Sequence, residues 1–89
     1  MEAEARQKRS RKRKGQKEKV QKLETQIASK ETKHAELTTE LEDPKTYDSP
    51  KRLMELNREL MTVSERLEML NSEWEKAASV LEQIDSAAV

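Results

Sequence analysis

Residues 53–84, with the sequence LMELNRELMTVSERLEMLNSEWEKAASVLEQI, carry one stripe of apolar side chains that decides the fold. The apolar residues recur at alternating intervals of three and four, at Leu53, Leu56, Leu60, Val63, Leu67, Leu70, Trp74, Ala77, Leu81 and Ile84. This spacing is the a/d repeat of a coiled coil. Because a helix cannot bury so narrow a stripe by itself in water, the repeat requires a partner helix.

A weaker stripe of the same kind occupies residues 16–42. Its a/d positions are Val20, Leu23, Ile27, Lys30, His34, Leu37 and Leu41. Lys30 and His34 are polar residues on an otherwise apolar seam, where such residues help to fix the register of two helices. A zinc site needs three or four ligands, and this chain has no cysteine and a single histidine. We therefore expect no metal site and assign His34 to the seam.

The segment DPKTYDSP, residues 43–50, separates the two stripes. Pro44 ends the first helix, and Ser49 followed by Pro50 is typical of a helix start. A break this short predicts an antiparallel hairpin. We expect the residues after Pro44 to form one tight helical turn, with Tyr47 folding back over the tip.

The predicted fold is all-α: an antiparallel two-helix coiled-coil hairpin with a basic, partly disordered N-terminal leader. The expected boundaries are a leader at 1–15, a first helix at 16–43, a turn at 44–49, a second helix at 50–86 and a frayed tail at 87–89. The leader ends at Gly15, because glycine costs about 1 kcal/mol relative to alanine inside a helix. A single long helix that dimerises is the alternative, and two prolines within seven residues argue against it.

Pairing Leu41 with Leu53 at the turn sets a register for the whole hairpin. Each further pair then joins two seam positions: Leu37–Leu56, His34–Leu60, Lys30–Val63, Ile27–Leu67, Leu23–Leu70 and Val20–Trp74. Beyond these pairs, the register places apolar residues opposite polar ones: Ala77–Gln16, Leu81–Arg13 and Ile84–Arg9. Either the basic leader becomes helical and covers this apolar strip with its aliphatic stems, or the strip packs on a partner.

A net charge of zero hides two halves of opposite sign. Residues 1–22 contain ten Lys and Arg against three Glu, a net charge of +7; residues 23–89 contain eight against fifteen Asp and Glu, a net charge of −7. The ten cationic residues are the candidate nucleic-acid-binding residues: Arg6, Lys8, Arg9, Arg11, Lys12, Arg13, Lys14, Lys17, Lys19 and Lys22. They would bind phosphates without reading bases. The alternative is a solvated linker, and without interleaved aromatic residues base stacking is not indicated.

The composition argues against several function classes. A chain without cysteine has no disulfide or thiol chemistry, which fits a cytoplasmic protein. One glycine cannot form a phosphate-binding loop, and no nucleophile–base pair stands out, so we predict no catalytic residue. No segment approaches the ~20 apolar residues that cross a bilayer, so we expect no membrane partner.

Four apolar residues of the second helix are candidates for a contact with another protein or domain. Leu81 and Ile84 extend past the first stripe, and Met54 and Met61 lie seven residues apart on one flank. Adaptable methionine pairs of this kind can mark partner surfaces. Trp74 lies on the seam, and we assign it to core packing.

The basic leader, the first stripe and the sequence ELEDPKTYDSPKRLMELNRELMTVSERLEMLNSEWEKAASVLEQI (40–84) together resemble the C-terminal coiled-coil domain of Uup-type ABC-F ATPases. The similarity covers about residues 16–85, and includes the Asp-Pro-x-x-Tyr tip at 43–47 and the Trp74-Glu75 pair. It implies a cytoplasmic protein in which two upstream ATP-binding cassettes hold the ATP. It also implies that the hairpin binds DNA or structured RNA, for example at the ribosome.

These observations predict a monomeric hairpin that gives a soluble ATPase a sequence-independent contact with nucleic acid. The chain itself is expected to be neither an enzyme nor a cofactor-binding domain. The first alternative is a structural arm that docks on its own cassettes or on a protein partner. The second alternative is a dimerisation coil, and an enzyme acting alone is the third.

Overall fold

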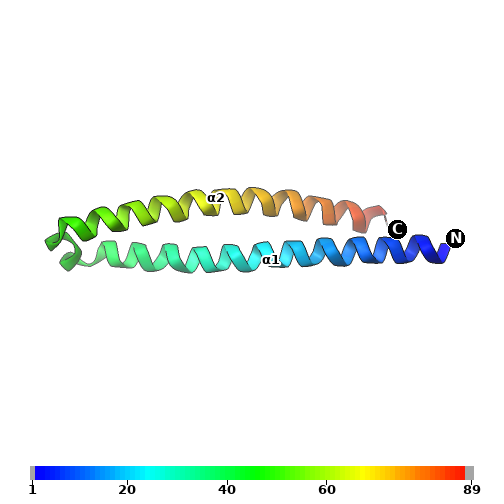
Figure 1. Ribbon diagram of the computed structural model, residues 1–89, viewed down its shortest axis with the longest axis horizontal. Helices are drawn as coiled ribbons and strands as arrows, with labels where there is room; N and C mark the ends of the chain where they lie inside the picture. Colours follow the sequence, from blue (N-terminus) through cyan, green and yellow to red (C-terminus); the bar gives the residue numbers. More distant parts are fainter. Residues whose placement is uncertain (1, 88–89) are drawn as a thin grey trace.

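The chain forms a hairpin of two long antiparallel helices in the computed structural model, which describes the backbone of residues 2–87 and the side chains of residues 7–87. Helix α1 spans Glu2–Glu42, a 3₁₀-helix η1 spans Pro44–Asp48, and α2 spans Pro50–Ala87. The helices lie side by side in Figure 1, with η1 at one end and both termini at the other. The hairpin measures 70 × 16 × 14 Å, so it is a rod. The predicted all-α antiparallel hairpin is confirmed.

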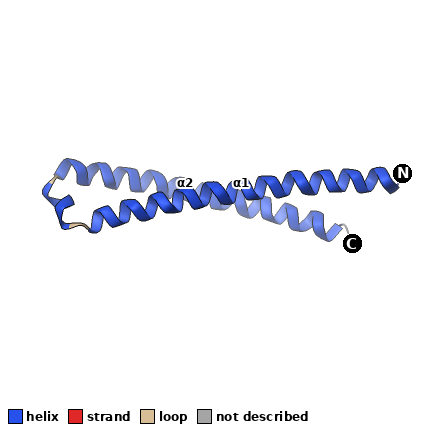
Figure 2. Cartoon of the chain, turned by 90° about the horizontal axis from the view of Figure 1, so that it is seen from below, coloured by secondary structure: helices blue, strands red, loops and turns tan. Residues whose placement is uncertain are grey.

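The helices cross each other when the hairpin is viewed from below (Figure 2), as expected for helices that wind around a shared apolar seam. The seam contains two clusters of buried side chains. The cluster near the termini contains Val20, Leu23, Leu70 and Ala77, with Ile27, Trp74 and Leu81 packed against it. The cluster near the tip contains Leu37, Leu56 and Val63, with Leu41, Leu60 and Leu67 packed against it. Every seam position assigned from the spacing is buried or half-buried, including Lys30 and His34.

The register at the open end is marked by a hydrogen bond between the helices. The side-chain amide of Gln16 donates from Nε2 to the carbonyl oxygen of Ala77 at 2.8 Å. This is the pair that the register predicts when it is continued from the turn. Gln16 therefore keeps the predicted register opposite Ala77, the last buried seam residue of α2, and lies at the edge of the buried core rather than within it.

The tip is built by short-range hydrogen bonds around η1. The Asp43 carboxylate caps η1 by accepting from the backbone N–H of Lys45 at 3.0 Å, and Pro44 occupies the first helical position. Thr46 is buried, and its hydroxyl donates to the carbonyl oxygen of Glu40. The expectation that Tyr47 covers the tip is wrong, because Tyr47 is 61% exposed. The tight turn directs Thr46 inward and its neighbour outward.

The start of the first helix differs from the boundary expected at residue 16. Helix α1 continues through Gly15 to Glu2, so residues 2–15 are helical rather than a partly disordered leader. Gly15 has an ordinary negative φ. The Lys, Arg, Gln and Glu residues around it have high helix propensity, which offsets the cost of about 1 kcal/mol for glycine in a helix. Met1 and residues 88–89 of the expected tail lie outside the described part of the chain.

Candidate nucleic-acid interface

The cationic residues of 6–22 all lie on α1, in the part of the helix nearest the N-terminus. We call this segment the basic foot. The side chains from Lys8 to Lys14, and those of Lys17, Lys19 and Lys22, are exposed. The side chain of Arg6 lies outside the described residues. Because the foot is helical, the spacing of its cations decides which of them share a face.

One face of the basic foot carries a row of four lysines. Lys8, Lys12, Lys19 and Lys22 are separated by four, seven and three residues, the intervals that return to the same side of a helix. Lys14 and Lys17, three residues apart, lie away from this row. The foot therefore presents positive charge over most of its exposed circumference, with the longest row on one flank.

Arg13 is the member of the foot that contacts α2. Its Nε lies 2.7 Å from Oδ1 of Asp85, and both side chains are substantially exposed. An exposed ion pair of this kind contributes at most about 1 kcal/mol. The contact connects the helical foot to the end of α2. Of the two outcomes considered for the apolar strip, the structure therefore shows the helical leader that the first one requires.

The four candidate protein-contact residues do not form one surface. Leu81 and Ile84 are half-buried, and Leu81 packs against the cluster that contains Leu70. Met54 and Met61 are 65% and 66% exposed and lie in the half of α2 that begins at Pro50, next to the tip. At 1.5 Å per residue, the 20 residues from Met61 to Leu81 span about 30 Å, too far for one compact patch.

Two polar contacts across the seam were not expected from the sequence. Trp74 donates from Nε1 to a carboxylate oxygen of Glu24 at 3.2 Å, which gives the indole a polar partner while its ring packs on the core. At the tip, Arg52 donates from Nε to Oε1 of Glu40 at 2.7 Å and from its Nη2 to Oε2 at 2.8 Å. The contact between Glu40 and Arg52 could have been predicted from the register, because these residues directly precede Leu41 and Leu53, which are paired on the seam.

The bidentate contact changes the titration of both partners. The hydrogen bonds from Arg52 lower the pKa of the Glu40 carboxyl below its ordinary value of 4.5, against a smaller opposing effect of desolvation. The same hydrogen bonds raise the pKa of Arg52 further above its ordinary value. Arg52 also lies 3.4 Å from Oε2 of Glu55, so a single guanidinium serves two carboxylates at the tip.

The Glu40–Arg52 pair predicts that acid weakens the hairpin. Because folding lowers the pKa of Glu40, its contribution is complete above the unfolded value near 4.5 and is lost as the pH falls through the folded value. Comparing thermal unfolding of the wild type with Glu40→Gln from pH 7 to pH 3 should show a difference in Tm that shrinks with acid. Glu36→Gln, at an exposed position of the same helix, is the control. A difference that stays constant or grows toward pH 3 would contradict this assignment.

Comparison with known proteins identifies the family. The family model described as ABC transporter C-terminal domain matches residues 8–79, which include the foot, both buried clusters and the tip. Searches of the curated proteins and of the solved structures returned no match. Within the described residues, no helix has the length and hydropathy needed to span a membrane. The long match, over a helical hairpin of the expected architecture, shows that this chain belongs to the ABC transporter C-terminal domain family.

Proposed function

We propose that the hairpin is a non-catalytic module that binds the phosphate backbone of DNA or structured RNA through its basic foot. The observation that carries this proposal is the clustering of more than half of the chain's cationic residues in residues 6–22. The cationic side chains from Lys8 onward are exposed, including that of Arg13, which also contacts Asp85. Lysine and arginine contacts with phosphates release counterions and need no base readout. The expected binding is therefore independent of sequence.

The features of the foot favour double-stranded or folded nucleic acid over single strands. Proteins that bind single strands without sequence preference combine positive charge with aromatic side chains on which bases stack. The chain has two aromatic residues, Trp74 and Tyr47. Trp74 packs on the core and bonds Glu24, and Tyr47 lies at the tip, far from the foot. Neither can provide stacking beside the basic foot.

The parent protein that we propose is an ABC-F ATPase of the cytoplasm. In this proposal two upstream cassettes bind and hydrolyse ATP, while the hairpin extends the contact surface of the protein by up to 70 Å. The family membership and the Asp-Pro-x-x-Tyr tip support this assignment. We further propose that the hairpin acts as a monomer, because its seam is covered within one chain.

A structural arm that docks on the cassettes is the second candidate function. The observation that favours it is the exposure of Met54 and Met61, which lie seven residues apart on the half of α2 nearest the tip. The two candidates differ in the region they use, because the methionines lie at the opposite end of the hairpin from the foot. Tight binding of the purified chain to the cassettes in the absence of nucleic acid would favour the arm.

The experiment that tests the first candidate is a titration of a fluorescent 20-base-pair DNA duplex, and of an RNA duplex, with the 89-residue chain. We expect binding at low salt, with dissociation constants of about 1–100 µM near physiological salt, the range of non-specific binding. Unlabelled duplexes of unrelated sequence should compete equally. Failure of both duplexes to bind at low salt would overturn the proposal.

A further inference from the structure

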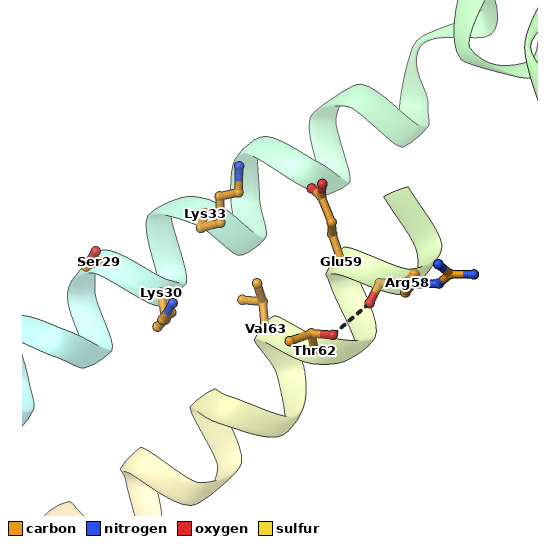
Figure 3. A pocket seen from close by; sticks show the side chains of 7 residues that line it. All are labelled: Ser29, Lys30, Lys33, Arg58, Glu59, Thr62 and Val63. Carbon is orange, nitrogen blue, oxygen red and sulfur yellow. Dashed lines mark hydrogen bonds between the residues drawn. The ribbon is translucent and has the colours of Figure 1, made fainter. Parts of the chain in front are cut away.

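A second cationic site lies midway along the hairpin, separate from the basic foot. It is a cleft of about 480 Å³ between the two helices, lined by Ser29, Lys30, Lys33, Arg58, Glu59, Thr62 and Val63. We call it the mid-hairpin cleft. In Figure 3, Val63 extends from α2 toward Lys30 and Lys33 of α1. Three cationic side chains and one carboxylate line the cleft, so its surroundings are positive, although the guanidinium of Arg58 points away from Lys30 and Lys33 (Figure 3).

The cations of the cleft have no close carboxylate partners. Within the described residues, the ion pairs shorter than 4 Å are those of Arg13 and Arg52 with their acidic neighbours. Lys33 therefore makes no such pair with Glu59, although both line the cleft. The hydroxyl of Thr62 donates to the carbonyl oxygen of Arg58 at 3.1 Å, and this bond stays within α2. The positive groups are available to an external anion.

The cleft lies on the same flank as the lysine row of the foot. Lys12, Lys19 and Lys33 are separated by multiples of seven residues, and a coiled coil keeps such positions on one side of its seam. Position 26, where the row is interrupted, is a glutamine. The register that places Arg52 beside Glu40 and Glu59 beside Lys33 also places Arg66 opposite Gln26. We call Lys12, Lys19, Lys33 and Arg66 the cationic row.

The opposite flank of the hairpin is acidic beyond the foot, whereas within the foot Lys17 holds the heptad position that Glu24 and Glu31 occupy further along α1. The acidic side chains on this flank lie on the opposite side of the seam from the cationic row. They are Glu24 and Glu31 of α1 and Glu68, Glu75 and Glu82 of α2. Glu24 is placed there by its bond to Trp74. A polyanion is repelled by these carboxylates. The flank of the cationic row carries Glu59, Glu73 and also Glu40, which is paired with Arg52. The charge distribution therefore allows one side of the rod to face nucleic acid.

From this geometry we propose that Lys30 and Lys33 of the mid-hairpin cleft form a second phosphate contact, so that a double helix lies along the cationic row. The inference rests on the proposed function and extends it from the foot to the middle of the hairpin. From Lys12 to Lys33 the helix rises about 31 Å, at 1.5 Å per residue. One turn of B-form DNA measures about 34 Å, so a duplex aligned with the rod reaches both sites.

The test compares three double variants, each of which removes two positive charges, in binding to a 20-base-pair DNA duplex. They are the cleft variant Lys30→Gln with Lys33→Gln, the foot variant Arg11→Gln with Lys12→Gln, and the tip variant Lys45→Gln with Lys51→Gln. Loss of one phosphate contact lowers affinity by about tenfold at 0.1 M salt and reduces the salt slope by about 0.9. We expect the cleft variant to bind 10- to 100-fold more weakly, and the tip variant to bind like the wild type.

The possible outcomes separate this inference from the proposed function. If the cleft variant binds like the wild type while the foot variant is weakened, the second contact is wrong and the proposed function stands. Equal weakening of the cleft and tip variants would indicate a response to net charge alone and would also overturn the inference. If the wild type does not bind, both proposals fail.

A further variant guards against an effect on folding, because Lys30 is half-buried on the seam. Lys33→Gln with Arg66→Gln changes two exposed positions of the cationic row. It should keep the wild-type circular dichroism spectrum and still weaken duplex binding by at least tenfold. Wild-type affinity in this variant would overturn the alignment of the duplex along the row.

Discussion

Replacing Arg11 and Lys12 with glutamine weakens binding of a 20-base-pair duplex by about 50-fold at 0.1 M salt. Each phosphate contact contributes a slope of about −0.9 to the dependence of log K on log[salt], so two lost contacts reduce affinity by a factor of that order. Both residues are exposed, and neither takes part in the ion pairs described for the hairpin. The measurement is fluorescence anisotropy at several salt concentrations.

The matched control for this prediction is the tip variant with Lys45→Gln and Lys51→Gln. It removes the same charge from exposed positions at the opposite end of the rod. If the foot makes the contact, the tip variant keeps the wild-type affinity and salt slope. Equal losses in the two variants would mean that net charge, and not the basic foot, determines binding.

Replacing Leu70 with alanine destabilises the hairpin by about 2–5 kcal/mol, the usual cost of truncating a buried leucine. Leu70 is fully buried in the cluster with Val20, Leu23 and Ala77. Since small domains are stable by only about 5–15 kcal/mol, this loss is a large part of the total. Urea unfolding followed by circular dichroism and by the fluorescence of Trp74, which packs on the same cluster, measures the change.

Two other variants make the Leu70 prediction specific to burial. Met61→Ala truncates an apolar side chain that is 66% exposed, and should change the free energy of unfolding by less than about 0.5 kcal/mol. Leu70→Met conserves volume and should cost less than about 1.5 kcal/mol. If Leu70→Ala and Met61→Ala have similar effects, the two helices do not enclose Leu70.

The positions on the seam could be predicted from the sequence because residues at the a and d positions of the repeat are the ones that two paired helices bury. The spacing identified Lys30 and His34 as seam residues despite their polarity, and both are half-buried. The pairing of Gln16 with Ala77 followed from the register alone and is confirmed by a hydrogen bond. Short-range rules also placed the helix start at Pro50.

The start of α1, the tip and the mid-hairpin cleft could not be predicted from the spacing of apolar residues, because other physical effects determine them. The helical state of residues 2–15 requires the helix propensities of many polar residues to exceed the cost of Gly15, whereas that cost alone predicted a helix start after the glycine. At the tip, the backbone geometry of a 3₁₀ turn decides that Thr46 is buried and Tyr47 exposed, although hydropathy favours the reverse. The mid-hairpin cleft could not be predicted from the spacing, because its cationic side chains come from both helices and are brought together only when the helices pair.

The proposal that the basic foot contacts phosphates is tested most directly by the salt dependence of duplex binding to the wild-type chain between 0.05 and 0.2 M. If about five phosphates are neutralised, the plot of log K against log[salt] is linear with a slope of about −4 to −5. A slope between zero and about −1, or no binding at the lowest salt, would contradict the proposal.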